Sequence, residues 1–190
     1  KNYKETLNGE NAVTFLNPKN SSKEYFIETG WASGGNEKIN LPLGNTIWKV
    51  KGNSTLTPNN PITLEWDNGE NLVFTKKIEL DDKFLFKIIQ GVKNNSNKSF
   101  QFYPYAQITR KGKPEGRQIY ILHEGFLGVF GDELKEEDFD DIEKEKFTIT
   151  STKGWLGITD KYWLTAIVPE KGKKFKAEFV AKNEKYRANY

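Results

Sequence analysis

Apolar and polar side chains alternate with a period of two residues along much of the chain. Between residues 71 and 80, positions 72, 74, 78 and 80 are apolar and share one face, with Lys76 as the exception. Residues 84–92 and 99–110 continue the alternation. Because successive side chains of a strand point to opposite faces, this pattern predicts β-strands that are buried on one side.

Turn-forming residues separate these strands. The motif Asp67-Asn68-Gly69 joins a strand expected at 62–66 to the strand expected at 71–80. Asn-Gly tolerates the positive φ angles of a tight hairpin turn. Residues 81–83 and 94–97 supply the next two turns. We therefore expect residues 62–110 to form a four-stranded antiparallel meander.

The flanks of the meander are also rich in strand patterns. Further strands are expected at 12–16, 25–29, 47–51, 118–122, 127–129, 147–152, 162–168 and 175–181. Only residues 133–144 have weak helical amphipathicity, and their acidic pairs favour a solvated loop equally. The pattern predicts an all-β, mostly antiparallel sandwich with at most one short surface helix. No internal repeat or linker interrupts this strand pattern, so we expect residues 1–190 to form a single domain.

Composition narrows the chemistry of this piece of chain. There is no Cys, which excludes disulfides, thiolate catalysis and Cys-based zinc sites. The longest apolar run, 162–169, falls far short of the roughly 18 residues of a membrane-spanning helix. There is also no Met, and Lys1 is too large for ordinary removal of an initiator Met, so we expect the chain to be part of a longer precursor.

Charge is concentrated in one acidic segment. Residues 132–146 contain nine acidic and three basic residues, a net charge of −6 within a chain of net +3. The compensating positive charge is dispersed and is almost all Lys. Nucleic-acid surfaces cluster Arg and Lys on one face, so no nucleic-acid binding is predicted. The acidic segment is either a solvated face that keeps the chain soluble or a contact surface.

The residues give no sign of catalysis. His123 is the only histidine, no G-x-S-x-G motif accompanies it, and His123-Glu124-Gly125 is typical of a turn. The acidic segment lacks the spacing of a calcium loop. We therefore predict no enzyme activity, no metal site and no cofactor. The five Trp leave one alternative open, a carbohydrate-binding or carbohydrate-active β-sandwich, although core packing is the favoured role of a strand Trp.

The most distinctive stretch is 154–169, which begins G-W-L-G-I-T-D-K-Y-W and ends in an apolar run and Pro169. Taken on its residues alone, it predicts an irregular turn that leads into a buried strand. Glycine permits unusual backbone angles there, and Asp160 is placed to cap the amides of the turn. These residues alone indicate no function.

This stretch resembles the hallmark of the large periplasmic domain of bacterial YidC membrane protein insertases, most closely those of alphaproteobacteria. The resemblance extends over residues 3–190 and is specific because several motifs occur in the same order. They are Tyr25-Phe26 with Thr29-Gly30-Trp31, Leu56-Thr57-Pro58 with the segment 61–69, Tyr103-Pro104-Tyr105-Ala106 and His123-Glu124-Gly125.

The resemblance implies a β-supersandwich, similar to the galactose mutarotase fold, on the periplasmic side of the inner membrane within a membrane-anchored parent. It implies no catalysis, because the mutarotases use a pair of histidines that a chain with one His lacks. Family members insert proteins through membrane helices that these residues do not include. The implied partners are SecDF and other Sec translocon components, nascent membrane proteins and chaperones. The family's further strands before and after these residues are expected to be missing.

The resemblance also directs attention to two groups of residues. We expect the acidic segment and its neighbours to form the edge that contacts SecDF, through Tyr120, Phe139, Asp140, Asp141, Glu143 and Phe147. A structural role is expected for the hallmark residues Gly154, Trp155, Gly157, Asp160, Lys161 and Tyr162.

Overall fold

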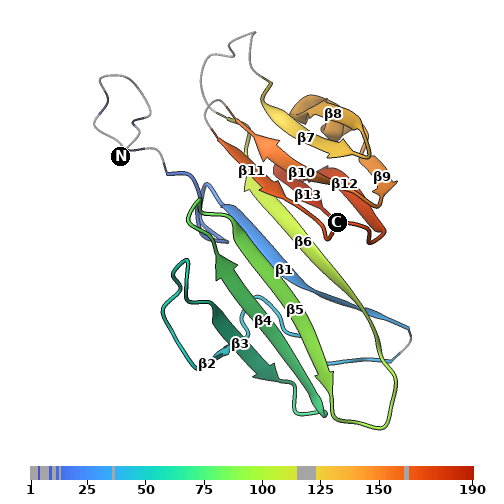
Figure 1. Ribbon diagram of the computed structural model, residues 1–190. Coiled ribbons are helices and arrows are strands. Elements are labelled where there is room, and N and C mark those ends of the chain that lie inside the picture. The colour runs from blue at the N-terminus through green and yellow to red at the C-terminus, as the bar shows by residue number, and fades with distance from the viewer. Residues whose placement is uncertain are drawn as a thin grey trace. The chain divides into compact units, whose positions relative to one another are not determined.

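The computed structural model describes residues 4, 9, 12, 14–35, 37–114, 123–160 and 163–190 (Figure 1). The chain divides into two compact units. The first unit is formed by Lys1–Glu28 together with Ala106–Tyr190, and the second unit is Thr29–Tyr105. In the described residues the strands are mostly antiparallel and are accompanied by one short helix, which confirms the predicted all-β fold class.

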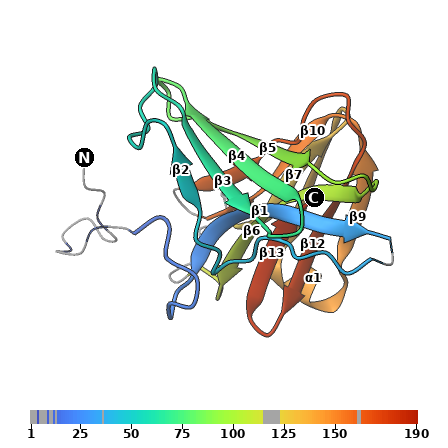
Figure 2. The same cartoon turned by 90° about the horizontal axis from the view of Figure 1, so that it is seen from below.

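The first unit is organised around two sheets. The five-stranded sheet has the order β1 (Tyr25–Gly34), β6 (Gln101–Lys111), β13 (Lys185–Asn189), β12 (Phe175–Lys182) and β9 (Phe147–Ser151). Part of β1 and part of β6 belong to the residues of the second unit. The four-stranded sheet has the order β11 (Leu164–Ile167), β10 (Gly154–Thr159), β7 (Gly125–Phe130) and β8 (Glu133–Asp138). The helix α1 (Phe139–Lys144) lies against β12 and β13 (Figure 2).

The second unit contains the four-stranded sheet with the order β2 (Lys49–Lys51), β3 (Ile62–Asp67), β4 (Leu72–Leu80) and β5 (Phe86–Asn94). The predicted meander is therefore correct for its first three strands and wrong for its fourth. Strand β6 pairs with β13 instead, and β2 takes the remaining place. Alternation sets which face of a strand is buried, but it does not select the neighbour. Here β6 places Ala106 and Ile108 in the core of the first unit.

Several other sequence expectations change. Residues 133–144 were expected to be one helix or loop and instead form β8 followed by α1. The stretch Gly154–Thr159 was expected to be an irregular turn and is strand β10, which lies between β7 and β11. Of the residues expected to form a strand at 12–16, those that the structure describes (12 and 14–16) belong to no strand, and the bridges nearby at Ala12 and Asn17 are isolated. The predicted strand at 118–122 lies outside the described residues.

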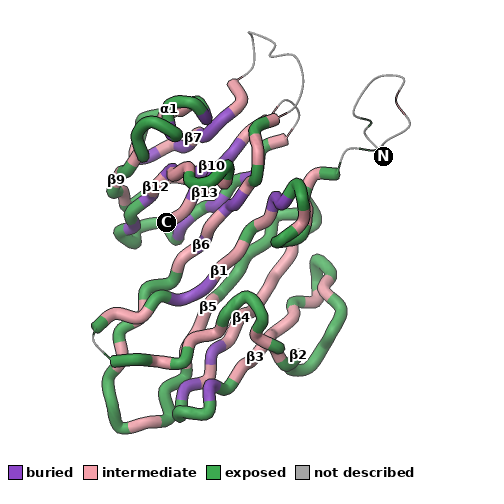
Figure 3. The backbone as a smooth tube through the Cα atoms, turned by 180° about the vertical axis from the view of Figure 1, so that it is seen from behind, coloured by how far each residue is buried: buried purple, intermediate pink, exposed green. Residues whose placement is uncertain are grey.

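Each unit has its own apolar core, visible as the buried segments in Figure 3. The core of the first unit is rich in aromatic rings from β7, β12, β13 and α1, and Phe126 and Phe179 in it are fully buried and stacked 5.0 Å apart. In the second unit, Trp31, Leu72 and Phe74 form the buried centre. Trp48 and Trp66 pack around them. Alternate residues of the strands supply both cores, as the period of two predicts.

Candidate interaction surface

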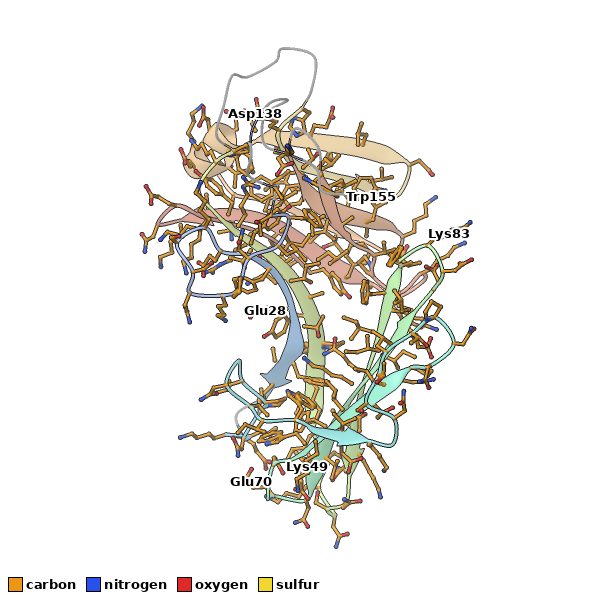
Figure 4. All side chains as sticks on the ribbon, turned by 90° about the vertical axis from the view of Figure 1, so that its left-hand side faces the viewer. Glu28, Lys49, Glu70, Lys83, Asp138 and Trp155 are labelled. Atoms are coloured by element: carbon orange, nitrogen blue, oxygen red, sulfur yellow. The ribbon has the colours of Figure 1, made fainter. Side chains whose placement is uncertain are left out.

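The acidic segment of the first unit is built on β8 and α1. Helix α1 has only six residues and carries Asp140 and Asp141 in its first turn and Lys144 in its last. Carboxylates near the start of a helix and a cation near its end both match the direction of the helix dipole. The Asp138 side chain makes no capping hydrogen bond at the start of α1, where Figure 4 labels it.

The apolar side of α1 anchors the helix in the core of the first unit. Phe139 is 5 % exposed and Ile142 is 3 % exposed. The Phe139 ring meets the Tyr186 ring edge to face at a centroid distance of 4.7 Å. A six-residue helix is far too short to be stable alone, so these buried contacts hold it in place.

Two of the predicted partner contacts therefore face inwards. Phe139 is buried, and Phe147 is half-buried and stacks on Phe179 at 5.1 Å. Both rings support the surface from beneath. Tyr120 lies outside the described residues. The carboxylates are what α1 presents to solvent, with side-chain exposures of 71 % for Asp140, 57 % for Asp141 and 45 % for Glu143.

Lysine and tyrosine side chains organise these carboxylates. Lys113, which follows β6, pairs with both Asp140 and Glu143, and the Tyr186 hydroxyl donates a hydrogen bond to Glu143. Lys144 pairs with Asp141 at 2.9 Å. Neither Lys113 nor Tyr186 could be linked with the acidic segment from the sequence, because each lies at least 27 positions along the chain from its partners.

These contacts shift the pKa values of the groups involved. The hydrogen bond from Tyr186, and then the one from Lys113, lower the pKa of Glu143. Pairing with Lys113 lowers the pKa of Asp140. Burial and then the bond to Glu143 raise the pKa of Tyr186 to about 12. The Glu143 and Asp140 carboxylates are thus ionised at neutral pH, and their shared pairing with Lys113 orients them, which suits recognition of a positively charged partner.

The net charge of the surface stays negative after pairing. The segment 132–146 carries −6 by itself, and two lysines from outside it, Lys113 and Lys153, contribute one positive charge each. Lys153 reaches Asp132 at 2.8 Å. We call the exposed carboxylates of Asp140, Asp141 and Glu143 the acidic face.

The hallmark glycines permit close contact of backbones around β10. At Gly154 the φ angle is +133°, and an added Cβ would lie 1.9 Å from the carbonyl oxygen of Val129. At Gly157 an added Cβ would lie 2.3 Å from the carbonyl oxygen of Thr165. The two glycines therefore allow β10 to lie between β7 and β11, while Trp155 between them is half-buried.

Asp160 fixes the turn that follows β10. Its Oδ1 accepts a hydrogen bond from the Trp163 amide at 3.1 Å, which is the capping role expected from the sequence. Its Oδ2 accepts from Arg110 Nη1 at 3.0 Å, and the Arg110 guanidinium lies 5.1 Å from the centre of the Tyr25 ring. This arrangement ties β6, β1 and the turn together inside the first unit. Lys161 and Tyr162 lie outside the described residues.

The remaining candidates for chemistry have structural contacts. The His123 Nε2 atom lies 2.9 Å from the Phe126 carbonyl oxygen, and Nδ1 lies 3.5 Å from Asp138. No group of three or more potential metal ligands converges in the residues that the structure describes. Within the same residues, no helix is long and apolar enough to cross a membrane.

The tryptophans offer no exposed platform for a sugar. Trp31 is 6 % exposed, and the other four are half-buried. Trp31 stacks on Trp48 and meets Phe74 edge to face, while Trp163 stacks on Phe15 at 4.7 Å. Packing against other rings is therefore what the structure shows for Trp31, Trp48, Trp66 and Trp163, and in the described residues no Trp contact favours the carbohydrate alternative.

Comparison with known proteins gives a consistent result. A family model described as the YidC periplasmic domain matches residues 1–190. The membrane protein insertase YidC of Pelagibacter ubique is 48 % identical over 190 residues, which is 100 % of this chain and 34 % of the relative. The membrane protein insertase YidC of Methylorubrum extorquens is 39 % identical over 97 % of this chain and 31 % of its own length. The chain spans about a third of the length of these relatives.

Proposed function

This chain belongs to the YidC periplasmic domain family, and from that membership we propose that it acts without catalysis, as a contact domain that assists insertion and folding of inner-membrane proteins. The family places the chain on the periplasmic side of the inner membrane. Its contacts would be with Sec components such as SecDF, or with nascent membrane proteins.

The observation that carries this proposal is the acidic face on its buried anchor. Phe139 and Ile142 fix α1 in the core, so the carboxylates of Asp140, Asp141 and Glu143 keep their positions before any partner arrives. Preorganised charges lose little conformational freedom on binding and favour a basic partner. We assign the acidic face as the surface that meets SecDF.

A charge-reversal experiment tests the assignment. The 190-residue chain is immobilised, and binding of detergent-purified SecDF is measured by biolayer interferometry for wild type and for the double variant D140K/D141K. We expect the variant to bind at least about fivefold more weakly and with a weaker dependence on salt, because exposed charges act mainly on association. The matched control is D82K, which reverses one exposed carboxylate in the second unit.

Retained affinity in a folded D140K/D141K variant would leave the acidic face as a solvating surface only. The fold of the variant is checked by circular dichroism and thermal unfolding. Both aspartates are well exposed, at 71 % and 57 % of the side chain, so substitution is expected to leave the fold intact.

A further inference from the structure

The strand β5 of the second unit has an open edge. It is nine residues long and stands last in its sheet, where β4 is its hydrogen-bonded neighbour among the described residues. The register with β4 runs from Leu72 opposite Asn94 to Leu80 opposite Phe86 without a bulge. No proline interrupts β5. Figure 4 marks the turn between β4 and β5 with Lys83.

The hydrogen bonds at the two ends of the hairpin show which amides point outwards. The Asp81 amide donates to the Leu85 carbonyl at 3.1 Å, and the Asn95 amide donates to the Asn71 carbonyl at 2.8 Å. In an antiparallel pair, hydrogen-bonded and non-hydrogen-bonded residue pairs alternate. The odd-numbered residues of β5 therefore bond to β4, and the backbone groups of Ile88 and its even-numbered neighbours point away from it.

Two of these even-numbered residues, Phe86 and Ile88, form an apolar strip at one end of β5. Further along the strand, the Gln90 side chain donates a hydrogen bond to the Gly30 carbonyl at 2.7 Å and Val92 packs against the core of the second unit. Phe86 is 56 % exposed and Ile88 is 40 % exposed. Cross-strand neighbours continue the strip, since Leu80 lies opposite Phe86 and Ile78 lies opposite Ile88. The other face of the sheet carries the Lys77–Glu79 and Lys87–Glu79 ion pairs, with Ile89 as an exposed apolar residue opposite Lys77. An open backbone edge and an apolar strip therefore coincide on β5.

The opposite edge of this sheet shows the usual protection. Strand β2 has three residues, and two of them are lysines, Lys49 and Lys51. Short length and lysines are common means by which proteins prevent unwanted strand pairing. Strand β5 also carries two lysines, Lys87 and Lys93, but they are spread over nine residues, and β5 has no proline, no bulge and no short length. Such an edge is the kind that binds an added strand.

The charges of the β5 side chains indicate which kind of strand would pair with β5. The charged residues of β5 are Lys87 and Lys93, and none is acidic. Two copies paired antiparallel about Gln90 would place Lys87 of one copy opposite Lys93 of the other, which is destabilising. A strand with apolar residues at alternate positions and acidic residues between them would instead match both the apolar strip and the lysines.

We propose that β5 binds an extended segment of a partner polypeptide by strand addition, and that this segment alternates apolar and acidic residues. The outward N–H and C=O groups of β5 provide the backbone pairing, the strip with Phe86 and Ile88 contacts the apolar side chains, and Lys87 and Lys93 face the acidic ones. The inference deepens the proposed function and rests on it, since it names a second polypeptide chemistry for the same contact domain.

Fluorescence anisotropy with the 190-residue chain tests this proposal. The probe is a fluorescein-labelled peptide, Val-Glu-Val-Thr-Val-Thr-Val-Glu-Val, whose two glutamates are six positions apart, as Lys87 and Lys93 are. Its matched control has the same side chains with alternate amides N-methylated. We expect the control to bind at least about tenfold more weakly, because it cannot complete the ladder. Equal binding of the two peptides, or no binding of the first at 1 mM, would overturn the proposal.

Variants of the chain complete the test. I88P removes an outward amide without removing a bond to β4, and we expect at least about tenfold weaker binding, whereas I88V should match wild type. If I88P does not fold, the double variant K87E/K93E provides the test. We expect this variant to bind a peptide with Lys in place of Glu more tightly than the original peptide, and an unchanged preference for the original peptide would contradict the proposal. SecDF binding by I88V and K87E/K93E is expected to stay at the wild-type level, so failure here is distinct from failure of the acidic face.

Discussion

The role of Phe139 can be decided by removing its ring. Phe139→Ala deletes a side chain that is 5 % exposed and that packs on Phe126 and Tyr186 at centroid distances of 5.5 and 4.7 Å. Truncation of a buried Phe costs about 3–5 kcal/mol. The helix that Phe139 begins has six residues and depends on this anchor, so we expect a loss in the upper part of that range.

The measurement must separate the two units, because unfolding of such a chain need not be two-state. Hydrogen-exchange mass spectrometry in increasing urea reports the opening of β12 and α1 in the first unit and of β4 in the second. We expect Phe139→Ala to weaken protection in the first unit only, and to lower the thermal midpoint of that unit by roughly 20 °C. Ile142→Val, which removes one methyl group from the same anchor, should cost only about 0.5–1.5 kcal/mol.

The anchoring role of Phe139 is refuted if the free energy of unfolding of Phe139→Ala lies within about 1 kcal/mol of the wild-type value. Weaker SecDF binding by a variant that keeps full stability would return Phe139 to the role predicted from the sequence, a direct contact with the partner. Loss of both stability and binding fits the anchor described above, because a displaced α1 no longer presents its carboxylates.

Three further predictions follow from single residues. Hydrogen bonds from Lys185 and from the Asn20 amide lower the pKa of the buried Glu24 below 4.5. The contribution of Glu24 to the stability of the folded chain is therefore complete above pH 4.5 and is lost as the pH falls through the pKa of the folded state. We expect Glu24→Gln to flatten the fall of the thermal midpoint between pH 5 and 3. Gly154→Ala should cost at least about 2 kcal/mol in urea unfolding because of the contact with the neighbouring strand, whereas Gly172→Ala, at φ +84° with open space around it, should cost only about 1–2 kcal/mol of backbone strain. Asp160→Asn should lose about 1.5–3 kcal/mol of thermal stability by weakening the bond to the arginine, and a loss no greater than that of a surface substitution would contradict the role of this turn.

Much of the fold follows from the period of two. The strands β3, β4 and β5 and their turns were predicted because alternation and the Asn68-Gly69 and Asp81 turn signals agree. The position of β6 was not predicted, since side-chain alternation sets a buried face but carries no information on the strand that pairs with it. Strand β10 was missed because its glycines suggest a turn when the carbonyls of the flanking strands are unknown.

The candidate surface was predictable only in part. Nine acidic residues in a short segment are visible in the sequence, and so is the weak amphipathicity of the residues around Phe139. The sequence did not show that α1 buries Phe139 and leaves the aspartates outside, because a helix of one and a half turns is too short for a clear period. Lys113 and Tyr186 join the surface through the fold alone.

Site-specific crosslinking tests the central assignment most directly. A photoactivatable residue replaces Asp141 on the acidic face or, as the matched control, Asp82 in the second unit, and each 190-residue chain is irradiated with membrane vesicles that contain SecDF. The acidic face predicts a crosslink to SecDF from position 141 that D140K suppresses, and none above background from position 82. Crosslinking of equal strength from both positions, or from position 82 alone, would contradict it.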